Sequence, residues 1–332
     1  MCHYTHFTMK ERECLLLMKK ENKSNKEIAQ ILGRSPSTIG RELKRNSVNG
    51  EYSCVVAEEK YRERRKNCKR KRVLDDPAVK EKVLELFLER QWSPEQISNR
   101  LKLEKSPIQI SYSTIYRAIY DHSLEPVPLT RGKRGLARKL RHRGKTRHVG
   151  GYVEKRGKYP VSNRLCDRPK EAENRSVIGH FEADTVLGKL GSECLLTVVD
   201  RASRFLFAKK CISKKSDFIN DAMIDLFKDL PREKFRSITP DRGNEFKKHA
   251  EVTQKLGGVP FYFPPPGSPW HRGTNENTNG LIREYLPKKF DMALLSDEDI
   301  ADIVFKINSR PRKCLGWLSP FESFYNLLLH LT

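Results

Sequence analysis

A succession of short apolar runs in the second half of the chain constrains the fold more than any other feature. The runs are rich in Val, Ile, Leu and Phe, as buried or half-buried strands are, and they occupy 180–187, 195–200, 205–208, 235–239 and 261–263. Apolar residues at helical spacing lie between and after them, in 218–227, 246–256 and 274–285. The order β-β-β-α-β-α-β-α predicts an α/β domain over 174–332.

The first part of the chain instead carries strong helix start signals. Thr8 with Glu11, and Ser24 with Glu27, have the spacing of capping boxes. After a turn at Gly33, a further helix is expected over 36–45. This pattern is typical of a helix-turn-helix, whose second helix enters the major groove of DNA. The expected DNA contacts are Ser37, Thr38, Arg41 and Arg45. The alternative is an ordinary three-helix bundle with solvated arginines.

A weaker form of the same pattern follows. Ser93 and Gln96 have capping-box spacing before one helix, and residues 113–120 predict a second helix after a longer turn. Thr114 and Arg117 lie off the apolar face of that second helix, so both are candidate DNA contacts. A purely structural unit is the alternative.

Charge divides the chain into two dissimilar halves. The net charge is +23, and the first 173 residues hold 41 Lys/Arg against 22 Asp/Glu. Such an excess favours a polyanionic partner, here double-stranded DNA. The predicted domains are a helix-turn-helix domain at 1–48, a basic arm at 49–72, a second helix-turn-helix-like domain at 73–123, a basic linker at 124–173, and the α/β domain at 174–332.

Cysteine usage and hydropathy bound the remaining classes. The eight Cys contain no C-x-x-C pair, so zinc-binding spacing is missing and reduced thiols are expected. The sequence has no secretory segment and no apolar run long enough to span a bilayer. We therefore expect a cytoplasmic protein with no membrane association.

Three carboxylates are placed as a metal site requires. Asp184 lies on the first predicted strand, Asp241 just past the end of a later strand, and Glu276 in the first turn of a helix that follows a Pro-rich loop. Hard oxygen ligands from three elements suit Mg²⁺ or Mn²⁺, and two such ions can support in-line phosphoryl transfer. Glu182, on the same strand face as Asp184, is the rival for the first position. The alternative for each is an ordinary surface or paired acid.

Several segments resemble bacterial insertion-sequence transposases of the thirty family. The resemblance rests on 34–46, 92–97, 114–116, 180–188, 239–246, 272–283 and 308–316, and the run Asn-Glu-Asn-Thr-Asn-Gly within 272–283 is highly specific. It implies a multidomain protein with all-α helix-turn-helix N-terminal domains and an α/β ribonuclease-H-like catalytic core. It also implies a catalytic and metal-binding Asp-Asp-Glu triad at Asp184, Asp241 and Glu276.

The activity expected from this resemblance is DNA transposition. The N-terminal region would bind the terminal inverted repeats of the element, and the core, with Mg²⁺ or Mn²⁺ (two ions), would cut 3′ ends and join them to target DNA. A homodimer or higher synaptic oligomer, in the nucleoid-associated cytoplasm, is expected because two ends must meet. Side chains expected to hold DNA near the cut are Arg272, Asn275, Asn279 and Arg283.

Two other functions remain open at this stage. Arg242 directly follows Asp241, and a cation there could contact a phosphate or weaken metal binding. The runner-up is therefore a DNA-binding repressor with a catalytically impaired core. A non-specific nuclease fits the triad but not two DNA-reading modules.

Overall fold

The computed structural model describes residues 5–68, 72–127, 133, 135–141, 160–189, 193–265 and 268–331. Contacts divide the chain into two compact units, Met1–Asp75 and Asp76–Thr332, which we call unit 1 and unit 2. About half of the predicted basic linker, at 128–132, 134 and 142–159, lies outside the described residues. No helix among the described residues is long and apolar enough to cross a membrane.

Unit 1 is a small helical domain that starts where the capping signals predict. Both capping boxes form, at Thr8 and at Ser24, and Gly33 takes the positive φ of +62° that ends the second helix. Leu15, Ile28 and Ile39 are fully buried in its core. Its helices are α1 (Met9–Lys20), α2 (Asn25–Ile31), α3 (Pro36–Asn46) and α4 (Cys54–Asn67).

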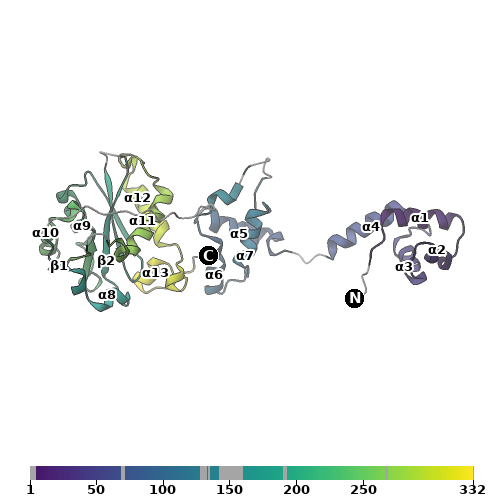
Figure 1. The fold of residues 1–332 in the computed structure, drawn as a ribbon, viewed down its shortest axis with the longest axis horizontal. Helices are drawn as coiled ribbons and strands as arrows, with labels where there is room; N and C mark the ends of the chain where they lie inside the picture. Colours follow the sequence, from purple (N-terminus) through teal and green to yellow (C-terminus); the bar gives the residue numbers. More distant parts are fainter. Residues whose placement is uncertain are drawn as a thin grey trace. The chain divides into compact units, whose positions relative to one another are not determined.

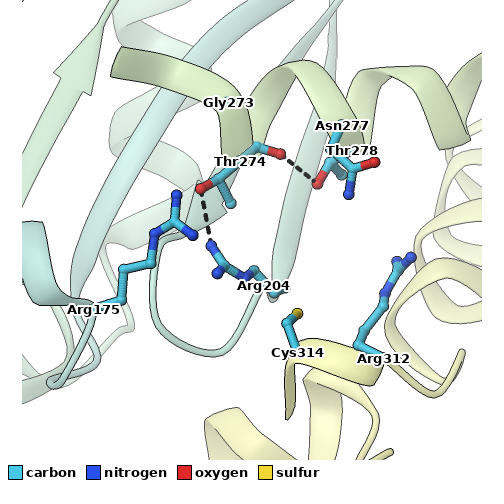
Figure 2. Close-up of a pocket in the computed structure, with 8 residues that line it drawn as sticks. All are labelled: Arg175, Arg204, Gly273, Thr274, Asn277, Thr278, Arg312 and Cys314. Atoms are coloured by element: carbon cyan, nitrogen blue, oxygen red, sulfur yellow. Dashed lines mark hydrogen bonds between the residues drawn. The ribbon is translucent and has the colours of Figure 1, made fainter. Parts of the chain in front are cut away.

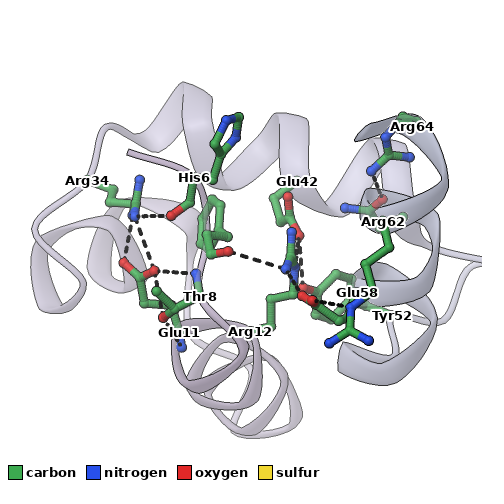
Figure 3. A network of polar contacts seen from close by, with 12 residues as sticks. His6, Thr8, Glu11, Arg12, Arg34, Glu42, Tyr52, Glu58, Arg62 and Arg64 are labelled. Atoms are coloured by element: carbon green, nitrogen blue, oxygen red, sulfur yellow. Dashed lines mark hydrogen bonds and ion pairs between the residues drawn. The ribbon is translucent and has the colours of Figure 1, made fainter. Parts of the chain in front are cut away.

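A buried arginine attaches the predicted basic arm to this domain. Arg12 of α1 is 1% exposed and forms ion pairs with Glu42 of α3, at 2.8 Å, and with Glu58 of α4 (Figure 3). Paired carboxylates satisfy the charge that burial would otherwise leave isolated. The first part of the arm is therefore a helix packed on the helix-turn-helix.

Unit 2 begins with the second set of helices, α5 (Pro77–Leu88), α6 (Pro94–Leu103) and α7 (Tyr112–Tyr120). Ser93 forms the predicted capping box, and Trp92, Ile97 and Ile115 are buried between the helices. Ser111 caps α7 as Ser35 caps α3, and each cap hydroxyl contacts a Ser two residues on and a Thr three residues on. Helices α3 and α7 thus begin with the same cap residue and the same hydroxyl contacts.

The α/β part of unit 2 is built on a four-stranded sheet of order β4-β3-β2-β5. Its strands are β2 (His180–Leu187), β3 (Cys194–Asp200), β4 (Leu206–Cys211) and β5 (Ser237–Pro240). β2 pairs antiparallel with β3 and parallel with β5, and β3 pairs antiparallel with β4. This sheet confirms the expected α/β domain.

Helices cover both faces of the sheet (Figure 1). Phe181 and Ala183 of β2 pack with α9 (Ser216–Phe227) and α10 (His249–Lys255) on one face. Val186 and neighbouring apolar side chains pack with α11 (Gly273–Tyr285) and α12 (Asp297–Asn308) on the other. Because side chains alternate along a strand, Glu182 and Asp184 point toward α11.

The remaining elements lie at the edges of this core. They are β1 (Asn163–Arg164), α8 (Lys170–Asn174), β6 (Tyr262–Phe263) and α13 (Pro320–Tyr325). The strand expected at 261–263 contacts the main sheet through one bridge, Ile238 to Phe261, and otherwise pairs with β1, which the sequence pattern did not reveal.

The second set of helices and the α/β core pack directly on each other. Arg100 of α6 and Glu322 of α13 are 0–1% exposed and form a bidentate pair, with both N–O distances 2.7 Å. Glu104 binds the same guanidinium at 2.6 Å, and the Gln96 amide donates to the carbonyl of Pro311 at 2.7 Å. This buried polar interface explains why residues 76–332 form one unit.

Candidate active site

Asp184 lies where the middle of β2 faces α11. Its Oδ1 accepts a hydrogen bond from the Thr185 backbone N–H at 2.8 Å, and its Oδ2 accepts one from Nδ2 of Asn279 at 3.1 Å. Nη1 of Arg272 lies 3.6 Å from the same Oδ2. Burial, reinforced by the charge of Asp241, raises the pKa of Asp184 to about 6, although Arg272 opposes the shift.

Asp241 lies beside Asp184 because of strand register. Ala183 of β2 pairs with Pro240, the last residue of β5. The residues that follow them, Asp184 and Asp241, therefore lie side by side. Asp241 is 7% exposed, and its Oδ1 accepts from the Gly243 N–H at 2.8 Å. Burial and then the neighbouring Glu245 raise its pKa, against the effect of Arg272. Two carboxylates therefore crowd one partly desolvated place.

A further acid, Glu245, is a residue that the sequence interpretation missed. It is 3% exposed, accepts from Oγ1 of Thr185 at 3.0 Å, and pairs with Lys214 at 2.8 Å. Its carboxylate folds back over Gly243, where an added Cβ would lie only 2.1 Å from Oε2. The one sequence signal is the spacing Asp-x-Gly-x-Glu, in which the glycine leaves room for the returning carboxylate.

Glu276 is exposed in the first turn of α11, one helical turn before Asn279. Within the described ranges, no three His, Cys, Asp or Glu side chains are grouped closely enough to hold a metal ion. The structure therefore brings Asp184 and Asp241 together and places Glu276 on the neighbouring helix, without joining all three in one cluster.

Glu182, the rival of Asp184, has a structural role. Its carboxylate is fully buried, pairs with Arg201, and accepts the backbone N–H of Asn275 at 2.8 Å. It thereby holds the first turn of α11 against the sheet, where a negative charge stabilises a helix start. Glu182 is fully buried and its charge is matched by Arg201, whereas Asp184 is half-buried and lies beside a second acid, Asp241, so Asp184 is the better candidate for a metal ligand.

Two of the side chains expected to hold DNA near the cut are used inside the protein. Asn275 is fully buried, and its Nδ2 donates to the Glu182 carbonyl at 3.1 Å, so the expected DNA contact is corrected to a structural one. Arg283 is half-buried and donates to the Leu187 carbonyl at 2.7 Å. Arg272 and Asn279, in contrast, lie directly at Asp184.

Arg242 does not face the two aspartates. Its Nε donates to the carbonyl of Pro264 at 2.7 Å, in the Pro-rich loop. The charges that act on Asp241 are instead those of Glu245, Arg272 and Lys214. Arg242 therefore points toward the Pro-rich loop, although it is next to Asp241 in the sequence.

The expected DNA contacts of the two helix-turn-helix modules lie on the second helix of each. Ser37, Arg41, Arg45 and Arg117 are exposed, and Thr38 and Thr114 are half-buried because each contacts its cap serine. Nε of Arg41 donates to the Ser37 carbonyl at 3.2 Å, which leaves the other guanidinium nitrogens outward. These positions are compatible with a groove-facing helix.

Comparison with known sequences gives consistent relatives. A model for a "Helix-turn-helix domain" matches residues 3–46. A transposase for insertion sequence element IS4351 from Bacteroides fragilis is 35% identical over 97% of this chain and 96% of the relative. Transposase InsI for element IS30A from Escherichia coli strain K12 is 37% identical, over 96% of this chain and 82% of the relative.

One further relative and one solved structure are also similar to this chain. A transposase for element IS1086 from Cupriavidus metallidurans is 33% identical over 99% of this chain and 97% of the relative. Among solved structures, a chain of the simian T-cell lymphotropic virus intasome in complex with a PP2A regulatory subunit matches with a TM-score of 0.38 and 16% identity, over 55% of this chain and 62% of that one.

Proposed function

We propose that this chain, which belongs to the family of insertion-sequence transposases that includes the IS30 transposase, cleaves the 3′ ends of its element and joins them to target DNA. The observation that carries the proposal is the closeness of Asp184, in the middle of β2, to Asp241, just past the end of the adjacent β5, with Arg272 and Asn279 beside Asp184. Burial and a neighbouring carboxylate raise the pKa of both aspartates, as at many catalytic sites.

The donor chemistry of this place fits a hard divalent cation. Asp184 and Asp241 offer carboxylate oxygens, and Glu276 supplies the third candidate ligand from α11. When bound, Mg²⁺ or Mn²⁺, as two ions, would activate the attacking oxygen and stabilise the leaving one. Binding would also relieve the repulsion between the two aspartates.

The protein's own groups have separate tasks in this proposal. Asn279 fixes the rotamer of Asp184 through its amide, and the Gly243 N–H fixes Asp241. Arg272, 3.6 Å from Asp184, is positioned to hold a phosphate oxygen of the strand being cut. The site thereby orients the reacting strand before chemistry starts.

End recognition belongs to the helix-turn-helix modules. The exposed Arg41 and Arg45 of α3, and Arg117 of α7, are proposed to contact the terminal inverted repeats. Because two ends must be joined in one event, the active form is proposed to be a dimer or a higher synaptic oligomer.

The test uses the DNA that flanks the reading frame as the source of inverted repeats. With Mg²⁺, wild-type protein is expected to release 3′-hydroxyl ends from duplexes that carry the repeat and to join them to a plasmid. Asp241→Asn should bind the same duplex with unchanged affinity but leave it uncut. A wild type that binds the ends and never cuts them would instead identify a repressor. Cutting that ignores the end sequence would identify a nuclease.

A further inference from the structure

A cavity of about 150 Å³ lies beside the first turns of α11 (Figure 2). Three arginines from separate segments line it: Arg175 follows α8, Arg204 lies between β3 and β4, and Arg312 follows α12. The opposite wall is formed by α11, through Thr274, Asn277 and Thr278. We call this cavity the arginine pocket.

In the described parts of the chain, the arginines of the arginine pocket have no carboxylate in ion-pair contact. Glu182 and Glu284 act on Arg175 and Arg312 without forming an ion pair. Arg204 donates to Oγ1 of Thr274 at 2.9 Å, and Arg312 donates one bond, at 3.2 Å, to the carbonyl of Ile307. These acceptors are neutral, so they do not neutralise the charge of Arg204 or Arg312.

The guanidinium of Arg312 is also partly removed from water, whereas Arg175 is exposed. Nε of Arg312 is buried and has no hydrogen-bond acceptor. Burial, then the neighbouring Arg310 and Arg141, lower the pKa of Arg312 to about 10. Burial followed by the charges of Arg204 and Arg201 lowers the pKa of Arg175. Desolvated cations that repel one another raise the free energy of the pocket until an anion enters.

The geometry of the arginine pocket favours a phosphate group as its anion. Arginine forks match the oxygens of a phosphate, and the start of the 13-residue helix α11 adds its positive end. The volume is below the roughly 300–1,000 Å³ of cavities that enclose whole small-molecule ligands. The pocket therefore suits one phosphate group whose parent molecule continues outside.

The arginine pocket and the two aspartates lie on different faces of α11. Thr274, Asn277 and Thr278 share one face at i, i+3 and i+4 spacing. Asn275 and Asn279 share another, which contacts Glu182 and Asp184. A phosphate in the pocket is consequently not the phosphate that reacts.

We propose that the arginine pocket binds a non-reacting backbone phosphate of the DNA whose strand is cut at Asp184 and Asp241. The proposal deepens the proposed transposase function and rests on it for the identity of the DNA. By holding a second phosphate, the pocket fixes how the strand lies across the N-terminal end of α11. It binds through the backbone, so it acts independently of base sequence.

Two substitutions test the pocket without touching the aspartates, each with a matched control. Arg175→Gln removes one positive charge, and Lys255→Gln removes the same charge at an exposed site on α10, across the sheet. Asn277→Asp adds a negative charge to the pocket, and Gln254→Glu makes the same change of amide to carboxylate on α10.

The first measurement uses full-length protein, metal-free pyrophosphate and chloride at matched ionic strength. All three Trp (92, 270 and 317) belong to unit 2, so tryptophan fluorescence follows the melting of that unit alone. Pyrophosphate is expected to raise the Tm of the wild type and of both α10 controls. The rise should be lost in Arg175→Gln and Asn277→Asp.

The second measurement is the salt dependence of binding to a duplex. The slope of log K against log [KCl] is expected to become shallower by about 0.9 in Arg175→Gln, the value for one lost phosphate contact, but not in Lys255→Gln. If Arg175→Gln matches its control in both measurements, the pocket is not a phosphate site. If only the pyrophosphate effect changes, the pocket takes a free phosphate compound and the DNA assignment is wrong.

The outcomes separate this inference from the proposed function. A wild type that fails to cut repeat-bearing ends overturns the transposase mechanism. A slope change in Arg175→Gln alone would still establish a phosphate contact in that case. Conversely, normal cutting by the wild type with no slope change in Arg175→Gln overturns the pocket assignment alone.

Discussion

Asp184 is less easily ionised in the folded protein than in an unfolded chain. Its pKa rises from its ordinary value of 3.8 to about 6, because burial and Asp241 both disfavour the carboxylate. Asp241 is shifted in the same direction. The free energy of unfolding therefore depends on pH through these groups.

Stability of the metal-free protein should consequently fall as pH rises. The folded state keeps its proton on Asp184 up to about pH 6, so this group's contribution is fully present below pH 4 and is lost as pH passes through 6. The expected loss is about 2 kcal/mol. Urea unfolding followed by tryptophan fluorescence at pH 4.5 and pH 7.5 measures it. Asp184→Asn should flatten the dependence, and an unchanged slope in that variant would contradict the assignment.

Gly243 should tolerate no side chain. A Cβ there would meet the Glu245 carboxylate at 2.1 Å, so Gly243→Ala must displace Glu245 from Thr185 and Lys214. We expect a loss of about 1–3 kcal/mol in stability and a strong reduction of cleavage. Gly257→Ala is a poor comparison because φ there is positive, whereas Gly273→Ala has open space and serves as the control. Equal stability of Gly243→Ala and wild type would disprove the contact.

Residue roles were predictable from sequence only where local position fixes them. Asp184 and Asp241 could be paired because a strand and the end of a later strand define their places. Glu245 was missed because its place depends on a chain reversal at Gly243. The burial of Asn275 depends on how closely α11 packs on β2 and β3, which the helical pattern cannot reveal.

At the scale of elements, the interface between α6 and α13 depends on buried charge. Arg100 binds Glu322 and Glu104 with almost no exposure to water. Capping boxes and apolar spacing predicted both sets of helices well, because these signals are local. The pairing of Arg100 with Glu322 was not predictable, because 222 positions separate the two residues.

Removing one partner of this pair should be costly. Glu322→Gln leaves the Arg100 charge buried with one fewer carboxylate, and we expect a loss of about 3–5 kcal/mol in the stability of unit 2. Glu95→Gln, which breaks the exposed pair with Lys313 at 3.2 Å, should cost less than about 1 kcal/mol. Urea unfolding of both variants measures the two losses in the free energy of unfolding. Similar losses in the two variants would mean that the buried pair stabilises the protein no more than the exposed pair does.

The second helices of the two helix-turn-helix modules, α3 and α7, share the pattern Ser-x-Ser-Thr-Ile-x-Arg and the same hydroxyl contacts at their start. This agreement indicates that Arg41 and Arg117 occupy equivalent places in their modules. Arg41→Ala is expected to weaken binding of the inverted repeat by about 1–3 kcal/mol if it contacts a base. Competition between a duplex that carries the repeat and a duplex of random sequence measures this loss of affinity. An equal loss on both duplexes would mean that Arg41 contacts the phosphate backbone.

At the scale of the whole molecule, the helix-turn-helix and the candidate active site belong to different units. Unit 1 contains the helix-turn-helix, while unit 2 combines the second set of helices with the α/β core that carries the candidate active site. The charge of the chain divides at a different place, since most of the net +23 lies in the first 173 residues, a range that includes the first part of unit 2. A second module packed on the core could hold an end at a fixed place relative to the site.

Asp184, Asp241 and Glu276 are proposed together to hold the ions that activate strand cleavage. The most direct measurement is anomalous scattering from Mn²⁺ in crystals of full-length protein bound to a duplex carrying the inverted repeat. We predict manganese peaks in contact with carboxylate oxygens of Asp184 and Asp241, with Glu276 turned to one of the same ions. No manganese peak at the two aspartates, or a peak held there without Glu276, would contradict the triad.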